Sequence, residues 1–274
     1  MPDSPDAHLD GTRHQTNPDP SPIVRLVDVH KAFGRQQVLR GVSLVFPRGK
    51  ATVVLGPSGC GKSVMLKHIV GLLRPDRGEV WFEDQRVDRL GEAALGPVRR
   101  QIGFLFQQSA LFDSMSVGDN VAFPLVEHTE LHRRAREERV HAVLNMVGLA
   151  DIAAKMPADL SGGQRKRVAL ARAIVLEPRL ILYDEPTTGL DPIRADVINE
   201  LIVRLQNKLS MTSIVVTHDL ASAFKVADAM VMLHEGRIAL EGPPQRFRES
   251  ADPIVQRFLR GEASEEELAA LTGR

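Results

Sequence analysis

Apolar and polar residues alternate in two ways along the chain, and each way predicts a different element. The stretches "IVRLVDVHKAF" (23–33) and "VLRGVSLVFPRG" (38–49) alternate with a period of two, which is typical of half-buried antiparallel strands. The stretch "KATVVLG" (50–56) is more uniformly apolar, like a central strand. A glycine-rich turn follows it, then a predicted helix at 62–73 and a strand at 79–84.

The middle of the chain has a different texture. A strand is predicted in "RRQIGFLF" (99–106), and a charged helix in "LHRRAREERVHAVLNMVGL" (131–149), with these apolar residues on one side: Val140, Val143, Leu144 and Val147. Another helix, with a glycine-rich start, is predicted in "SGGQRKRVALARAIV" (161–175). Its basic run predicts a solvated helix face: Arg165, Lys166 and Arg167.

From Leu180 onward, strands and helices alternate again. "LILYDE" (180–185) and "TSIVVTH" (212–218) are predicted to be buried strands, and "AMVMLHEGRIALEG" (229–242) a hairpin that turns at Glu235-Gly236. Between the two strands lies a predicted helix at 195–209 with these apolar residues: Val197, Ile198, Leu201, Ile202 and Leu205. This order predicts an α/β fold whose mostly parallel core sheet has helices on both faces.

The same pattern divides the chain. Residues 1–22 contain many prolines and aspartates, which predicts a disordered tail without the pattern of a signal peptide. Residues 23–243 form the α/β domain, with a helical subdomain inserted from about Arg99 to Glu177. Residues 244–274 form a C-terminal helical extension of two short helices, the second opened by a capping box: Ser264 and Glu267.

Composition narrows the class of protein. The 274 residues suit one large α/β domain or a domain with a subdomain. Lys+Arg and Asp+Glu both total 35, so no net field attracts the chain to nucleic acid. The single cysteine excludes an internal disulfide and fits a reducing compartment. No stretch approaches the roughly 18 to 20 apolar residues of a membrane helix, so any membrane span must come from another chain.

The turn "GPSGCGKS" matches the pattern of a phosphate-binding P-loop between a strand and a helix. Its glycines let backbone N–H groups point inward, and the helix N-terminus adds positive potential. Lys62 would reach the β- and γ-phosphates, and the Ser63 hydroxyl would hold Mg²⁺. The candidate nucleotide-binding residues here are Gly56, Pro57, Ser58, Gly59, Cys60, Gly61, Lys62, Ser63 and Val64.

Two further motifs suggest what the P-loop is used for. The strand "LILYD" delivers Asp184 to the carboxyl edge of the sheet as a Mg²⁺ ligand, and Glu185 would orient and polarise an attacking water. The second motif, "LSGGQ", predicts another anion site at a helix N-terminus, formed by Ser161, Gly162, Gly163 and Gln164. One nucleotide does not need two phosphate-binding sites from distant parts of one chain. The second site would therefore bind a nucleotide held by another copy of the chain.

These motifs together resemble the ATP-binding subunit of ABC transporters, over about residues 23–243. Gln107 in "FLFQQ" matches the Q-loop of that family, Asp191 in "GLDP" its D-loop, and His218 in "VVTHD" its switch histidine. Phe33 stands where the family has an aromatic residue, usually tyrosine, that stacks on adenine. Val64 stands where threonine is common.

The resemblance implies a P-loop NTPase of the ABC type, with an N-terminal antiparallel β subdomain, that hydrolyses ATP between two head-to-tail copies. The residues implied to act from one copy are Lys62, Ser63, Gln107, Asp184, Glu185 and His218, with Ser63, Gln107 and Asp184 on Mg²⁺. The motif LSGGQ matches the signature motif of the family. The other copy would contribute these signature residues, Ser161 and Gly163 above all.

The stretch from Phe106 to Val126, together with 61–80, is similar to the ATPases of Mla and Mce-type lipid transporters. That similarity implies a place on the cytoplasmic side of the bacterial inner membrane and a role in phospholipid transport. The implied partners are an MlaE-like permease, an Mce-domain lipid-binding protein and a STAS-domain regulator. The apolar residues expected either to line the permease groove or to pack locally are Leu111, Phe112, Met115, Val117, Val121 and Phe123.

Three alternatives remain open from the sequence. An ABC ATPase for another cargo, such as an amino acid or a drug, would differ only in its substrate or permease. A non-transport ABC protein of DNA repair or translation would carry a long coiled coil, a zinc module or a second ATP domain, and none of these is in the sequence. A nucleotide kinase or GTPase would leave "LSGGQ" and His218 unexplained.

Overall fold

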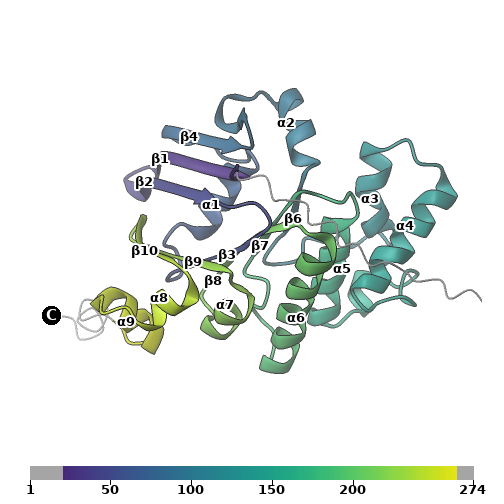
Figure 1. Ribbon diagram of the computed structural model, residues 1–274. Coiled ribbons are helices and arrows are strands. Elements are labelled where there is room, and N and C mark those ends of the chain that lie inside the picture. Colours follow the sequence, from purple (N-terminus) through teal and green to yellow (C-terminus); the bar gives the residue numbers. More distant parts are fainter. Residues whose placement is uncertain (1–20, 264–274) are drawn as a thin grey trace, which may run out of the picture.

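The computed structural model describes residues 21–263. The predictions for the N-terminal tail up to residue 20 and for the capping box at Ser264 and Glu267 lie outside the described residues. Within them, two sheets and the helices between and around them make up the fold (Figure 1).

The first sheet is antiparallel, with the strand order β2-β1-β4-β5. The second sheet has the order β10-β9-β3-β8-β7-β6, and all its neighbours are parallel except β9 and β10, which form a hairpin. The strands are β1 (Val24–Phe33), β2 (Gln36–Phe46), β3 (Ala51–Leu55), β4 (Arg77–Phe82), β5 (Gln85–Arg86), β6 (Ile102–Leu105), β7 (Leu180–Asp184), β8 (Thr212–Thr217), β9 (Ala229–His234) and β10 (Arg237–Gly242). The predicted α/β fold, with a mostly parallel core sheet and an antiparallel N-terminal subdomain, is confirmed.

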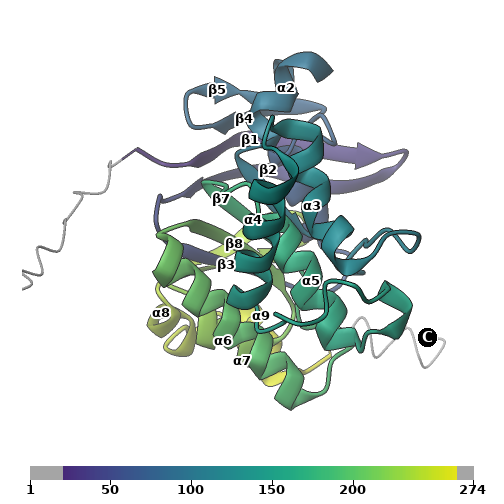
Figure 2. The same cartoon turned by 90° about the vertical axis from the view of Figure 1, so that its right-hand side faces the viewer.

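Helices cover both faces of the core sheet. The helices are α1 (Lys62–Ile69), α2 (Glu92–Arg99), α3 (Val117–His128), α4 (Arg133–Met146), α5 (Gly162–Ile174), α6 (Pro192–Leu209), α7 (Leu220–Val226), α8 (Pro244–Arg248) and α9 (Pro253–Arg260). Short 3₁₀ turns lie at Val87–Arg89 and Pro157–Asp159. Figure 1 places α3 and α4 on the side of the molecule opposite α8 and α9, and in Figure 2 α3 and α4 face the viewer.

The central strands are apolar throughout because each face of the sheet packs on its own hydrophobic core. In β3, Val53 and Leu55 join the core beneath α3 to α9, whereas Val54 joins the core shared with α1 and the antiparallel sheet. Strand β7 alternates in the same way, with Tyr183 on the first side and Leu182 on the second. The sheet is therefore fixed from both sides, and its carboxyl edge is a rigid base for loops.

The segment 99–106 was predicted to be a strand, and this is confirmed, since β6 pairs with β7 inside the core sheet. Within the range of about 99–177 that was expected to form the helical subdomain, the helices begin with α3. A short apolar strand does not reveal from its own sequence which sheet it joins. In α6, Val197 was expected on the buried side but is 48% exposed. The buried stripe of α6 is formed by the other predicted residues: Ile198, Leu201, Ile202 and Leu205.

The loop before α3 is organised by one buried amide. Asn120 accepts a hydrogen bond from the Phe112 N–H (2.8 Å) and donates to the carbonyls of Phe112 (3.0 Å), Met115 (3.1 Å) and Ser116 (3.0 Å). Among the apolar residues expected to line a permease groove, two instead lie fully buried in the core, and local packing explains them: Val117 and Val121.

Replacing Asn120 should therefore loosen the whole loop. Asn120→Ala leaves several buried backbone groups without partners, so we expect the free energy of unfolding to fall by about 3 kcal/mol. The measurement is chemical denaturation of the full chain. The matched control is Asn145→Ala, because Asn145 is exposed on α4 and its side chain contacts His141 at 3.3 Å, and it should change stability by less than about 0.5 kcal/mol. Equal effects of the two substitutions would contradict the role of Asn120.

Candidate active site

The turn after β3 has a conformation that requires glycine at two positions. Gly56 has φ 152°, and a Cβ built there would lie 2.2 Å from the Leu233 carbonyl oxygen. Gly61 has φ 109°, and its Cβ would meet the Leu39 side chain at 2.9 Å. These glycines hold the loop tightly between the hairpin β9-β10 and β2, so the turn is preformed.

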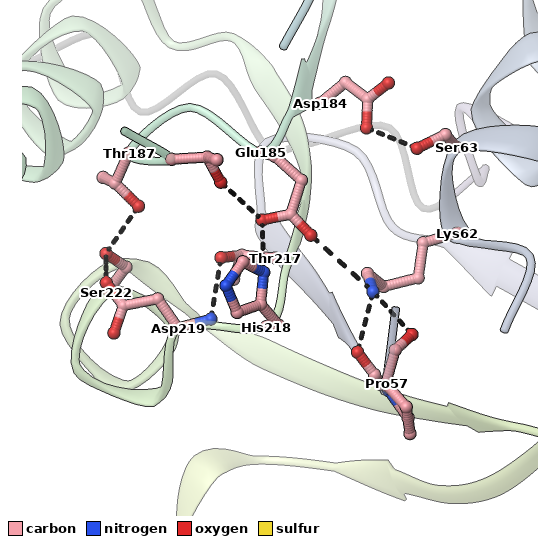
Figure 3. A network of polar contacts seen from close by, with 12 residues as sticks. Pro57, Lys62, Ser63, Asp184, Glu185, Thr187, Thr217, His218, Asp219 and Ser222 are labelled. Atoms are coloured by element: carbon pink, nitrogen blue, oxygen red, sulfur yellow. Dashed lines mark hydrogen bonds and ion pairs between the residues drawn. The ribbon is translucent and has the colours of Figure 1, made fainter. Parts of the chain in front are cut away.

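Lys62, the first residue of α1, points its ammonium group back into this loop (Figure 3). Its Nζ donates to the carbonyl oxygens of Gly56 (2.7 Å) and Pro57 (3.0 Å), and it lies 3.6 Å from Oε1 of Glu185. The side chain is buried, so its charge is placed in a site of low dielectric, where electrostatic interactions are strong.

Ser63 and Asp184 form the oxygen pair expected for a magnesium ion. The Ser63 hydroxyl donates to Oδ1 of Asp184 at 2.7 Å, which brings α1 and the end of β7 together (Figure 3). Gln107 lies after β6 and lines the same hollow as Ser63. Hydroxyl, carboxylate and amide oxygens are the donors that Mg²⁺ prefers, so this set fits that ion.

Glu185 directly follows β7 and is held in a strained conformation. Its φ is 49°, in the left-handed region that residues other than glycine rarely adopt. Oε2 of Glu185 accepts a hydrogen bond from the Thr188 hydroxyl (3.2 Å) and contacts Nδ1 of His218 (2.9 Å). Figure 3 shows the carboxylate between His218 and Lys62, which fixes its direction toward the P-loop.

A hollow of about 360 Å³ connects these groups. Its lining residues are Phe33, Val38, Ser58, Gly59, Gly61, Lys62, Ser63, Val64, Gln107, Glu185 and His218. Phe33, at the end of β1, is 47% exposed, and the Lys31 ammonium lies 5.5 Å from its ring centroid. An exposed ring beside a P-loop suits stacking on a purine base.

Cys60 is half-buried and packs against the apolar core next to the antiparallel sheet. Burial raises the pKa of its thiol above the usual range. At neutral pH the thiol is therefore protonated, and Cys60 behaves here as a small packing residue of the P-loop.

The signature residues lie outside this hollow. Ser161 caps α5: its Oγ accepts from the Gln164 N–H (3.3 Å), and its own N–H donates to the Gln164 side chain (2.9 Å). A Cβ built on Gly162 or on Gly163 would have only ordinary contacts, at 3.6 and 3.7 Å. Asp191 likewise caps α6, where it accepts from the Arg194 N–H at 3.0 Å. None of these residues lines the hollow of its own chain.

The prediction for Lys166 was wrong. Lys166 was expected on a solvated face, but it is only 5% exposed, and its Nζ donates to the carbonyl oxygens of Gln107 and, at 3.4 Å, of Glu185. Arg167 is also engaged, with bonds of 3.2 Å to the carbonyls of Val147 and Gly148. Three successive basic residues are typical of a solvent-exposed helix face. No pattern in the sequence indicated that the middle one turns inward.

Comparisons with known proteins agree with this geometry. The family model described as ABC transporter matches residues 39–188. The chain belongs to the ABC transporter family. The matched residues include the P-loop, Asp184, Glu185 and the motif LSGGQ.

Two curated ABC relatives and one solved structure illustrate the similarity. The intermembrane phospholipid transport system ATP-binding protein MlaF of Haemophilus influenzae is 44% identical over 84% of this chain and 87% of its own length. The probable ribonucleotide transport ATP-binding protein mkl of Mycobacterium tuberculosis is 42% identical over 84% of this chain and 64% of its own. A dimeric, post-hydrolysis ATP-binding cassette bound to ADP and Pi is 34% identical, with a TM-score of 0.75, over 80% of this chain and 98% of its own. The chain is accordingly an ATP-binding subunit of the ABC class.

The burial of Asp184 at this ABC site lowers the stability of the folded chain. Burial raises the pKa of the Asp184 carboxyl; the hydrogen bond from Ser63 opposes this shift, and the Glu185 charge adds to it. A raised carboxyl pKa favours the folded state at low pH, and this contribution is lost as the pH rises through the folded-state pKa. At neutral pH the ionised Asp184 therefore lowers stability.

We expect Asp184→Asn to raise the free energy of unfolding at pH 7 to 8 by about 1 kcal/mol, in the absence of nucleotide and metal. The amide oxygen can still accept from Ser63, and the buried charge is gone. Thermal melts from pH 4 to 8 should show the advantage shrinking as the pH falls. Asp151→Asn, at an exposed position, is the matched control and should behave as wild type throughout. A destabilised Asn variant at pH 7 would contradict this account.

Proposed function

We propose that this chain is the ATP-hydrolysing subunit of a transporter that moves phospholipid across a bacterial envelope through a separate permease. The observation that carries the cargo class is the 44% identity to an intermembrane phospholipid transport ATP-binding protein over 84% of the chain. The observation that carries hydrolysis is the grouping of Lys62, Asp184 and Glu185 around one P-loop.

In the proposed reaction Glu185 accepts a proton from a water that attacks the γ-phosphorus, and the bond from that phosphorus to the β-bridging oxygen breaks. The contacts from His218 and Thr188 hold the carboxylate in place for this step. Lys62 would exchange its loop carbonyls for phosphate oxygens and stabilise their charge. Mg²⁺, held by Ser63, Asp184 and Gln107, would neutralise part of the charge on the β- and γ-phosphates.

The second copy would complete the site. Ser161 uses its oxygen as an acceptor within α5, which leaves the hydroxyl proton free to donate to a phosphate. The N–H groups at the start of α5 add positive potential there. Because these donors do not line the hollow of their own chain, they would act on the nucleotide of the partner. Asp191 would lie at the same contact between the two copies.

The proposed assembly also includes membrane proteins. Within residues 21–263, no helix is long and apolar enough to cross a bilayer. The segment 106–126 still exposes apolar side chains, with Phe112 at 42% and Val126 at 51%, and these would contact an MlaE-like permease on the cytoplasmic side of the inner membrane. An Mce-domain lipid-binding protein and a STAS-domain regulator complete the proposed set of partners.

A mixing experiment tests the shared site. Lys62→Ala should damage the half of the site that binds its own nucleotide. Gly163→Asp should damage the half lent to the partner, because a carboxylate repels the triphosphate although it is tolerated at a helix N-terminus. Each variant alone should be inactive. After exchange of subunits, an equal mixture should regain about a quarter of the wild-type ATPase rate, since half of the dimers keep one intact site of two.

The control for this experiment is a mixture of Lys62→Ala with Glu185→Gln. Both changes damage the same half of the site, so no dimer contains an intact one and no activity should return. If the first mixture also stays inactive, or if dilute monomers hydrolyse ATP at the full rate, the shared site is wrong.

The cargo is tested on the complex from its own membranes. Gentle purification of the tagged chain, followed by mass spectrometry, should identify a permease with bound phospholipid. Phe112→Asp should reduce the recovered permease, because it places a charge on the proposed contact surface. The mycobacterial relative suggests ribonucleotide transport as a second candidate. A permease with bound ribonucleotide would support that function and would end the phospholipid proposal.

A further inference from the structure

One helix, α5, touches both halves of the proposed nucleotide machinery. Its N-terminus carries the signature residues, and Lys166 lies two residues after the last of them, in the second turn of the helix. The Lys166 ammonium turns inward and donates to the carbonyl oxygens of Gln107 and Glu185. Lys166 does not line the hollow that contains the P-loop, so nothing places it on the nucleotide itself.

The two carbonyls have matching positions in the fold. Strands β6 and β7 pair in parallel up to Leu105 and Tyr183, and Gln107 and Glu185 each lie two residues further along. Beyond this point the ladder between β6 and β7 has ended, although the Glu185 N–H still donates to the Val216 carbonyl of β8 (3.0 Å). Lys166 therefore links the two strand ends by a side-chain bridge between two carbonyl acceptors, which a long stem with three rotatable donors suits well.

The bridge lies in a demanding environment. The ammonium group is buried, and burial lowers the pKa of Lys166, whereas the charges of Asp184 and Glu185 act in the opposite direction. Glu185 has its strained φ of 49° at this point, so a donor on its carbonyl helps hold a conformation that the backbone alone disfavours. Burying the Lys166 cation costs free energy that a neutral side chain of similar length would not cost.

We propose that Lys166 is a positioning residue for ATP hydrolysis: it ties the backbone of Gln107 to that of Glu185, so that the loop after β6 controls the direction of the Glu185 carboxylate. This inference rests on the proposed ATPase function and adds a residue to it. A displacement of the 106–126 segment, or of α5 when its signature engages a partner, would reach Glu185 through this one ammonium group.

The test uses three variants of the full chain: Lys166→Met, Lys166→Gln and Lys166→Arg. Met has a similar length without donors, Gln can reach one carbonyl, and Arg can bridge two. We expect kcat to fall about tenfold in the Met variant, less in the Gln variant and least in the Arg variant, with KM for ATP within about twofold of wild type. The matched control is Lys208→Met, at an exposed position near the end of α6, which should leave both constants unchanged.

Nucleotide binding is measured separately in a background that does not turn over. Glu185→Gln and the double variant with Lys166→Met should bind a fluorescent ATP analogue, and dimerise with ATP, to the same extent. Equal binding with reduced kcat distinguishes positioning of Glu185 from general damage to the fold, which would also weaken binding.

Several outcomes would overturn the proposal. A Met variant with kcat within twofold of wild type would remove Lys166 from the reaction, and so would a loss that appears only in KM or in dimerisation. If the Met variant does not fold, the Gln and Arg variants decide, since equal kcat in both would show that the number of donors is irrelevant. An inactive wild-type chain would instead contradict the ATPase function itself.

Discussion

The whole site depends on the parallel register of three neighbouring strands, β3, β8 and β7. Leu55 of β3 pairs with Thr217 of β8, and Asp184 of β7 pairs with Val216 of the same strand. The residues that follow these strand ends therefore emerge side by side at one edge of the sheet. The P-loop begins there after β3, His218 after β8 and Glu185 after β7. The pairing of the strands therefore places three segments that are far apart in the chain next to one another. Contacts between the loops themselves are not needed for this.

This edge concentrates charge in a poorly solvated place. Among the described residues, the buried ionisable side chains here are Lys62, Lys166, Asp184 and Glu185. Each is partnered by an opposite charge, a hydroxyl or a carbonyl, but removal from water still costs free energy. The strained backbone of Glu185 adds to this cost. The two apolar cores on the faces of the sheet offset this cost.

The sequence predicted what local patterns encode. Apolar runs marked the core strands, and the glycines and lysine of the P-loop marked the turn, because both signals lie within a few neighbouring residues. It failed where the outcome depends on distant packing. The pattern left open whether Val117 and Val121 line a docking surface or pack locally, and only the packing of α3 on the core decides for the second. Lys166 looked solvated, yet α5 turns it toward two strand ends that no local pattern connects with it.

Glycines at the P-loop and glycines at the start of α5 are explained by different constraints. Gly56 cannot hold a side chain, because the Leu233 carbonyl oxygen of the same chain is in the way. Gly162 and Gly163 have room for one and ordinary backbone angles, so this chain alone gives no reason for them. Their small size matters only to something that approaches the start of α5 from outside. On the proposed function, that would be a triphosphate bound to a second copy, whose charge suits the positive potential of a helix N-terminus. The signature would then be a requirement of the dimer, present in the sequence of each subunit.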